Sequence, residues 1–322
     1  MQPAANKHPL LRKRKRALEW LLEGTVLSSG YIVVAALILI FVFVGKEAVP
    51  LITSAEVHEE VSVGSMVAPT TGQVWQPVAE VPKYALLPLL IGTLKVTLVA
   101  LLIALPLAVG AAIYTSEFAG RRTREIIKPV VELLAGIPSV VLGFFALMVL
   151  ATWLQDSFNY RFRLNAISAG AGLALAVIPI VYTVAEDALS AVPQTFRDGA
   201  LALGANRWQT AWRVVLPAAM PGVFAACVLG FGRAIGETMI VLMASGNAAT
   251  MSWSPTDSFR SFSATIAAEL GEVVNGSAHY HVLFFLGALL FVITFFLNLL
   301  GLWYVRRLRG RLEGRARAGG KG

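Results

Sequence analysis

Six long apolar stretches constrain this chain more than any other feature. A helix needs about 20 mostly apolar residues to cross the core of a bilayer, and such stretches run over roughly 26–44, 85–114, 130–154, 166–189, 218–245 and 282–305. Only 14% of residues are charged and 57% are hydrophobic, which leaves too few charges for a soluble surface. No long segment alternates apolar and polar residues as strands of a membrane barrel do. We therefore predict an all-α polytopic membrane protein with about six transmembrane helices.

The first apolar stretch follows a basic segment. Residues 1–24 are polar and contain five consecutive basic residues from Arg12 to Arg16. Signal peptides and uncleaved signal anchors share this pattern. The stretch is about 19 residues long and no small-x-small cleavage site closes it. We therefore predict a retained transmembrane helix at 25–44.

Lysine and arginine predict the orientation of the chain. Cytoplasmic segments are enriched in these residues. Residues 1–24, 115–129, 190–216 and 306–322 hold 20 of the 27, whereas the intervening segments 45–83, 155–165 and 246–281 hold five. Both termini are therefore expected to be cytoplasmic, with basic tails at 1–24 and 306–322, and 45–83 is expected to be extracytoplasmic. The net charge of +8 reflects this topology and predicts no nucleic-acid partner.

The basic loop at 190–217 predicts a pair of short helices. Pro193 can open a helix, and Gly204 can end one in the left-handed conformation. Residues 206–215 again place apolar side chains at helical spacing, and Pro217 is expected to begin the next membrane helix. From the residues alone, this helix pair fits equally an element that lies on lipid headgroups and one that docks a partner protein.

The same loop resembles the EAA motif of ABC importer permeases, in which E-A-A, a glycine and a closing I-x-L-P form the coupling helix. Glutamate is replaced by aspartate and the first alanine by glycine. The resemblance implies the type I importer (MetI-like) permease fold over 84–305 and a loop that docks into a separate ATPase subunit. The positions that match are Asp198, Gly199, Ala200, Gly204, Leu216 and Pro217.

Motifs in the membrane stretches narrow this resemblance. Residues 229–239 read LGFGRAIGETM, which is similar to the fifth helix of PstC-type permeases of the phosphate-specific (Pst) importer. Residues 132–143 resemble the third helix of the same family. The resemblance covers about residues 85–305 and implies a permease for inorganic phosphate in the bacterial cytoplasmic (inner) membrane. It also implies a second homologous permease subunit (PstA-type), two ATP-binding subunits (PstB-type), an extracytoplasmic phosphate-binding protein (PstS-type) and the lipid of the membrane as partners.

Arg233 and Glu237 are the candidate substrate pathway. A charge at mid-membrane is costly unless it is paired or hydrated, and residues four apart share one face of a helix about 6 Å apart. The guanidinium offers a planar fork of donors that matches oxyanions. Glu237 would keep the anion from binding too tightly, and Thr238 would offer a hydroxyl. A purely structural ion pair is the alternative.

The remaining polar residues in or near the apolar stretches predict structural roles. Lys95 can reach the interface from the start of its stretch. Glu186 and Asp187 are expected to be solvated at the cytoplasmic end of theirs. The single cysteine, Cys227, excludes an internal disulfide, and His279 and His281 have no third ligand beside them, so we predict no metal site.

The chain contains no G-x-x-x-x-G-K-[ST] motif, so it cannot bind ATP in that mode. We predict a transport subunit without enzymatic activity and without a cofactor, driven by ATP hydrolysis in a separate subunit. Two alternatives stay open. The same fold could serve another oxyanion, such as molybdate, tungstate or sulfate. An ion-coupled secondary transporter is the other, although it would need no docking loop.

Overall fold

The computed structural model describes residues 9–67 and 74–319 of the chain. Within these residues the fold is almost entirely helical, and six helical segments are long and apolar enough to cross a membrane. They are Glu19–Thr53, Leu86–Phe118, Ser139–Phe158, Ala166–Ser190, Arg207–Ile235 and Ala278–Arg307. The prediction of an all-α protein with about six spans is thus confirmed. The outer parts of both basic tails, and part of the 45–83 segment, lie outside the described residues.

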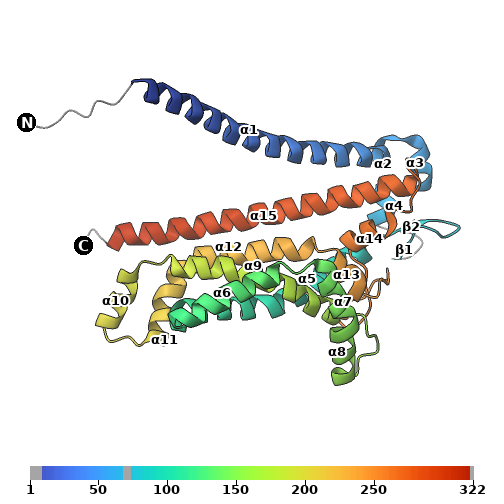
Figure 1. Ribbon diagram of the computed structural model, residues 1–322. Coiled ribbons are helices and arrows are strands. Elements are labelled where there is room, and N and C mark those ends of the chain that lie inside the picture. Colours follow the sequence, from blue (N-terminus) through green and yellow to red (C-terminus); the bar gives the residue numbers. More distant parts are fainter. Residues whose placement is uncertain (1–8, 68–73, 320–322) are drawn as a thin grey trace, which may run out of the picture.

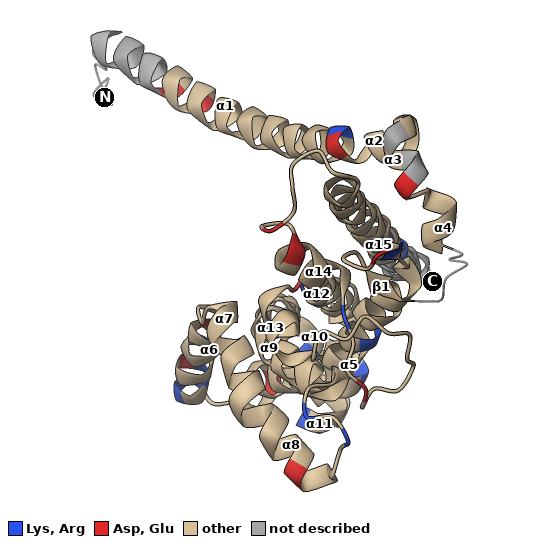
Figure 2. Ribbon diagram, turned by 90° about the vertical axis from the view of Figure 1, so that its right-hand side faces the viewer, with Lys and Arg blue, Asp and Glu red and all other residues tan. Residues whose placement is uncertain are grey.

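The first span lies in α1 (Pro9–Ala48), a 40-residue helix that stands apart from the other spans (Figures 1 and 2). Its apolar side chains are exposed along most of its length. It contacts α15 (Ala278–Gly319) near its C-terminal end, where Phe41 packs on Phe291 with ring centroids 4.9 Å apart. Most of the apolar surface of α1 therefore faces the surroundings of the chain.

Short elements fill the segment between the first two spans. They are α2 (Pro50–Thr53), α3 (Ala55–Glu60), α4 (Val63–Val67) and an antiparallel hairpin of β1 (Trp75–Gln76) and β2 (Lys83–Tyr84). The sequence shows little helical periodicity here, and each helix has only one or two turns. Packing supplies the order instead, because Leu51 and Met66 are fully buried in a cluster with Phe262 and Leu286.

The centre of the bundle is the pair α5 (Leu86–Ile113) and α9 (Ala166–Ser190). Small residues let membrane helices approach closely. A Cβ at Gly170 would lie 2.5 Å from the side chain of Val99 on α5. Further along α9, a Cβ at Gly230 of α12 (Leu216–Ile235) would lie 2.4 Å from Val181. Because these two glycines have no side chain, the three helices pack in close contact.

The chain after α5 differs from the predicted span at 130–154. A π-helical turn, Tyr114–Phe118, ends the second span. A separate amphipathic helix, α6 (Arg121–Ala135), follows, and the third span then runs through α7 (Ser139–Phe145), a π-helical turn (Ala146–Leu150) and α8 (Ala151–Phe158). Gly136 ends α6 and Pro138 precedes α7. This interruption separates the basic helix α6 from the apolar third span. Hydropathy alone does not separate the two.

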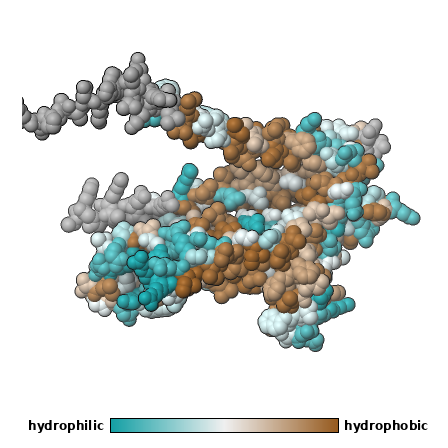
Figure 3. All heavy atoms as spheres, in the orientation of Figure 1, coloured by the Kyte–Doolittle hydropathy of each residue, from teal (hydrophilic) through white to brown (hydrophobic). Residues whose placement is uncertain are grey.

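The second half of the chain holds the elements that form the candidate site. They are α10 (Gln194–Ala202), α11 (Arg207–Thr210), a π-helical turn (Ala211–Val215), α12, α13 (Met239–Ala244), α14 (Phe262–Glu269) and α15. The N-terminal end of α1, the C-terminal end of α15, α10 and α11 lie at one end of the molecule, while α2, α3, α4 and the hairpin lie at the other (Figure 1). An apolar band separates these hydrophilic ends (Figure 3). This arrangement agrees with the predicted topology.

Candidate transport site and coupling loop

Helix α12 does not cover the whole of the predicted stretch at 218–245. It stops at Ile235, and α13 begins at Met239. The carbonyl of Glu237, in the gap, accepts a hydrogen bond of 2.8 Å from the Ser263 hydroxyl on α14. The predicted span at 218–245 is therefore present, but its helix ends at Ile235, where Gly236 is the C-cap, and a second short helix, α13, forms the rest. Non-helical backbone at membrane depth occurs where it is buried in protein or lines a water-filled cavity.

The predicted pair of Arg233 and Glu237 is present at this break. Arg233 Nη2 lies 3.2 Å from Glu237 Oε2, and the Glu237 side chain is 4% exposed whereas that of Arg233 is 46% exposed. Glu237 stands beyond the end of α12, so the contact depends on the break and not on a shared helix face. The carboxylate is thus the buried partner and the guanidinium the accessible one.

Arg233 opens onto a hollow of about 590 Å³ between α12 and α15. The hollow includes Leu290 and Thr294, which lie near the middle of the span Ala278–Arg307. This places Arg233 near the centre of the membrane. A neighbouring hollow of about 510 Å³ shares Gly236 and Leu290 with it and includes Thr238. The structure therefore brings Arg233 and Thr238 to adjoining hollows, and Glu237 is the buried partner of Arg233 behind them.

Asn298 is a lining residue that the sequence reasoning missed. It lies on α15 beside Gly232, where a Cβ would be 3.4 Å from its amide oxygen. Its Nδ2 donates to the Thr294 carbonyl at 2.9 Å. The signal was available, since Asn298 is the single amide side chain in the apolar stretch 282–305. A polar side chain at mid-membrane facing a hollow is a candidate for the pathway.

The predicted pair of short helices is also present, at the end of the molecule where α1 begins and α15 ends. Gly204 ends α10 with a φ of +85°, the left-handed conformation that glycine adopts freely. Asn206 then opens α11 with a capping box, in which its side chain accepts from the Gln209 N–H at 2.8 Å. Asp198 and Gly199 are exposed on α10, and Ala200 is buried.

The second helix of the loop does not end before the membrane. The structure continues from Arg207 through the π-helical turn and Leu216 to Ile235 as one helical segment of 29 residues. Pro217 stands in the first turn of α12, as expected, but α12 continues the preceding segment without a break. Proline is tolerated in the first turn of a helix, but here a helical segment already precedes it.

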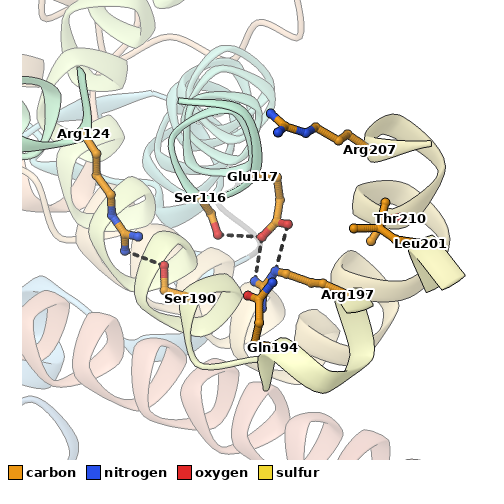
Figure 4. A pocket seen from close by; sticks show the side chains of 9 residues that line it. All are labelled: Ser116, Glu117, Arg124, Ser190, Gln194, Arg197, Leu201, Arg207 and Thr210. Carbon is orange, nitrogen blue, oxygen red and sulfur yellow. Dashed lines mark hydrogen bonds and ion pairs between the residues drawn. The ribbon is translucent and has the colours of Figure 1, made fainter. Parts of the chain in front are cut away.

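Arg197 joins the loop to two membrane helices (Figure 4). Its Nε and Nη2 donate to Glu117 at 3.0 and 2.7 Å. The same guanidinium donates to the carbonyls of Leu189 and Val192 at the end of α9. The hydrogen bond to Glu117 raises the pKa of Arg197 above its usual value. A cavity of about 400 Å³ adjoins the pair and includes Arg124 and Arg207.

Glu186 corrects a prediction, because its side chain is fully buried rather than solvated. It accepts hydrogen bonds from Arg124 and from Lys128, the latter at 3.0 Å. Hydrogen bonds to Asp187 and then Glu186 raise the pKa of Lys128. Asp187 is 61% exposed, as expected. Helix α6 is therefore held on α9 by ion pairs.

A second polar cluster lies at the opposite end of the molecule, around Glu269. Its carboxylate accepts from Trp75 Nε1 at 3.1 Å, pairs with Arg260 and lies 3.0 Å from His279 Nε2. His281 instead contacts the carbonyl of Glu47. The two histidines thus have separate partners, and the described residues contain no group of three metal-ligating side chains.

Lys95 reaches polar groups at the same end, as expected of a side chain near the start of a span. Its Nζ donates to the carbonyls of Ser252 and Ser254, at 3.2 and 2.9 Å. The contact holds the 246–261 loop against α5, which supports a structural role.

Together the broken helix with its paired charges and the exposed helical loop define a membrane-embedded transport subunit. A family model described as "Binding-protein-dependent transport system inner membrane component" matches residues 104–312. This is more than half of the chain, which therefore belongs to that family. The chain is a multi-pass membrane protein and the permease subunit of an ABC importer.

Curated relatives agree with this assignment. The chain is 36% identical over 226 residues to the probable ABC transporter permease protein YqgH of Bacillus subtilis, covering 70% of this chain and 73% of the relative. It is 35% identical over 260 residues to the phosphate transport system permease protein PstC of Mesorhizobium japonicum, covering 75% and 79%. The corresponding protein PstC 1 of Mycobacterium tuberculosis is 36% identical over 249 residues, covering 70% and 73%.

Solved structures show the same fold at lower identity. A bacterial ABC transporter involved in the import of the acidic polysaccharide alginate matches with a TM-score of 0.61 and 17% identity, covering 92% of this chain and 98% of that one. The MetNI methionine ABC transporter in an inward-facing conformation matches with a TM-score of 0.52 and 18% identity, covering 69% and 94%. These likenesses confirm the predicted type I importer permease fold.

Proposed function

We propose that this chain is the PstC-type permease subunit of a phosphate importer in the bacterial cytoplasmic membrane. Inorganic phosphate passes the hollow at Arg233, and ATP hydrolysis in a separate subunit drives the movement. The choice of phosphate as the proposed substrate rests on the names of the two phosphate transport relatives. The residues supply the means by which an oxyanion can cross the centre of the membrane.

The observation that carries this proposal is the unequal exposure of the pair at the helix break. Arg233 is 46% exposed and Glu237 is 4% exposed, so an anion in the hollow meets the donor fork of Arg233 first. The nearby carboxylate weakens the net attraction, which permits release, since conduction needs binding that is favourable but weak enough to leave. The Thr238 hydroxyl and the Asn298 amide offer further hydrogen bonds next to the guanidinium.

The exposed loop is the proposed site at which the separate ATPase subunit docks and drives movement of this chain. Asp198, Gly199, Ala200 and Gly204 dock α10 into an ATPase subunit of the PstB type. Leu216 and Pro217 begin the continuation of the loop into α12. The complete transporter then holds two such ATPases, a second homologous permease of the PstA type and an extracytoplasmic phosphate-binding protein of the PstS type. The surface nearest the binding protein is formed by the 45–83 and 246–281 segments.

Phosphate uptake by the complete transporter in proteoliposomes tests the proposal. Arg233→Ala should lower uptake by about 10-fold or more, because the charge-assisted donors are lost, while Arg233→Lys should retain part of it. Leu229→Ala is the matched control, since Leu229 lines the same hollow without a polar group. Full uptake by Arg233→Ala in an assembled complex would make the ion pair structural.

The same assay distinguishes phosphate from other oxyanions. Unlabelled phosphate should compete with labelled phosphate, whereas molybdate, tungstate and sulfate in equal excess should not. Preferential uptake of one of these three would retain the permease function and replace the substrate.

A further inference from the structure

We propose that the ion pair of Arg197 and Glu117 is the linkage by which movement of the coupling loop reaches α5. The two residues act as positioning residues for coupled transport, because neither contacts the proposed pathway. This inference rests on the proposed function only in that the loop docks an ATPase. It adds a second route from the loop into the membrane, besides the helical continuation into α12.

Helix α10 has little else to hold it against the membrane helices. Of its nine residues only Ala200 is buried, and Phe196 and Leu201 are exposed. By contrast, the side chains of Arg197 and Glu117 are 14% and 7% exposed. The Arg197 side chain is therefore one path by which a movement imposed on α10 reaches the membrane helices, beside the contact of Trp208 on α11 with Phe118, whose ring centroids lie 5.7 Å apart.

The geometry of the pair suits transmission of force in a fixed direction. Two parallel hydrogen bonds join the guanidinium fork to the carboxylate, which fixes orientation as well as distance. Arg197 also bonds the carbonyls of Leu189 and Val192. Removing one partner of such a shielded pair leaves the other charge without compensation.

Helix α5 extends the connection to the far side of the membrane. It is packed against α9 at Gly170 without room for a methyl group, so a displacement at Glu117 is carried along a closely packed helix. At its other end, a Cβ at Gly92 would lie 2.1 Å from the carbonyl of Arg260. The pair thus joins the coupling loop to the 246–261 loop, which holds Arg260.

ATP hydrolysed per phosphate imported, measured on the complete transporter in proteoliposomes, tests the linkage. Glu117→Gln should raise this ratio by about threefold or more, and Arg197→Lys, which keeps the charge without the fork, should raise it less. Glu125→Gln is the matched control, because Glu125 pairs with Arg121 on α6 in an exposed ion pair that joins no two elements. An unchanged ratio in assembled Glu117→Gln complexes would overturn the linkage.

Hydrogen exchange of the assembled complex with and without ATP gives a readout that needs no transported substrate. In the wild type, ATP should change exchange both in 194–202 and in 110–118. In Glu117→Gln the response should persist in 194–202 and disappear in 110–118. A merely structural role would instead raise exchange in 110–118 equally in both states, which would refute the linkage. If the wild type took up no phosphate, only the proposed substrate would be refuted.

Discussion

At the scale of single residues, Glu269 holds together three parts of the extracytoplasmic side. Burial alone raises the pKa of this carboxyl, but the hydrogen bond from His279, the charge of Arg260 and the hydrogen bond from Trp75 outweigh it. The pKa is therefore below its ordinary value of 4.5. Burial raises the pKa of the neighbouring Tyr84 to about 12, so its hydroxyl stays neutral.

The lowered pKa of Glu269 predicts a pH dependence of stability. A carboxyl with a lower pKa in the folded state adds stability above its unfolded pKa and loses it as pH falls. Glu269→Gln should therefore lower the free energy of unfolding by about 2 kcal/mol at pH 7, and the difference should shrink below about pH 4.5. Thermal unfolding of the purified subunit measures this, with the exposed Glu272→Gln as control. A difference independent of pH would contradict the role of the charge.

The sequence predicts some of these residues and not others for a physical reason. Arg233 and Glu237 stand out because a charge inside an apolar stretch needs a partner or water. The burial of Glu186 and the pairing of Arg197 depend on partners 62 and 80 residues away. Helix packing brings those partners together, and no local sequence pattern predicts this packing.

At the scale of elements, the turn between α10 and α11 gives a sharp test of the coupling loop. Gly204 has open space around it, so a substitution there acts through the backbone alone. Gly204→Val should strain the left-handed turn by about 1–2 kcal/mol, while Gly204→Asn should be tolerated. Co-purification of the ATPase subunit and ATP-driven uptake should both fall with valine and be largely kept with asparagine.

The matched control for this turn lies outside the loop, in α1. Gly24 is helical with no atom near its missing Cβ, and alanine is favoured over glycine in a helix. Gly24→Ala should therefore leave docking and uptake intact. Equal loss in Gly204→Val and Gly204→Asn would show that the conformation of the turn is not what docking requires.

Hydropathy does not predict where each helix begins and ends. The turn at Gly204 and the cap at Asn206 follow from local chemistry, so the sequence predicts them. The break after Ile235 lies within the apolar stretch 218–245, and the carbonyl of Glu237 in the break accepts a hydrogen bond from Ser263 of α14, a partner distant in the sequence. The C-terminal half of α6 is apolar, so hydropathy does not distinguish it from the third span.

At the scale of the whole molecule, the predicted topology can be tested with single cysteines. Val78 and Leu203 are 93% and 91% exposed and belong to opposite ends of the bundle. In a Cys227→Ser background the chain has no other cysteine. A membrane-impermeant maleimide should label Val78→Cys in intact spheroplasts and Leu203→Cys only after permeabilisation. Labelling of both from the same side would overturn the orientation inferred from lysine and arginine.

The unbroken helix from Arg207 to Ile235 has a mechanical consequence. Its 29 residues span about 44 Å at 1.5 Å per residue, so it can act as a lever between the cytoplasmic surface and the membrane centre. A tilt of about 5° at one end displaces the other by about 4 Å, more than the length of a hydrogen bond. The lever ends two residues after Arg233, whereas the carbonyl of Glu237 is bonded to Ser263 on α14, so a tilt of the lever would change the distance between the Arg233 guanidinium and the Glu237 carboxylate.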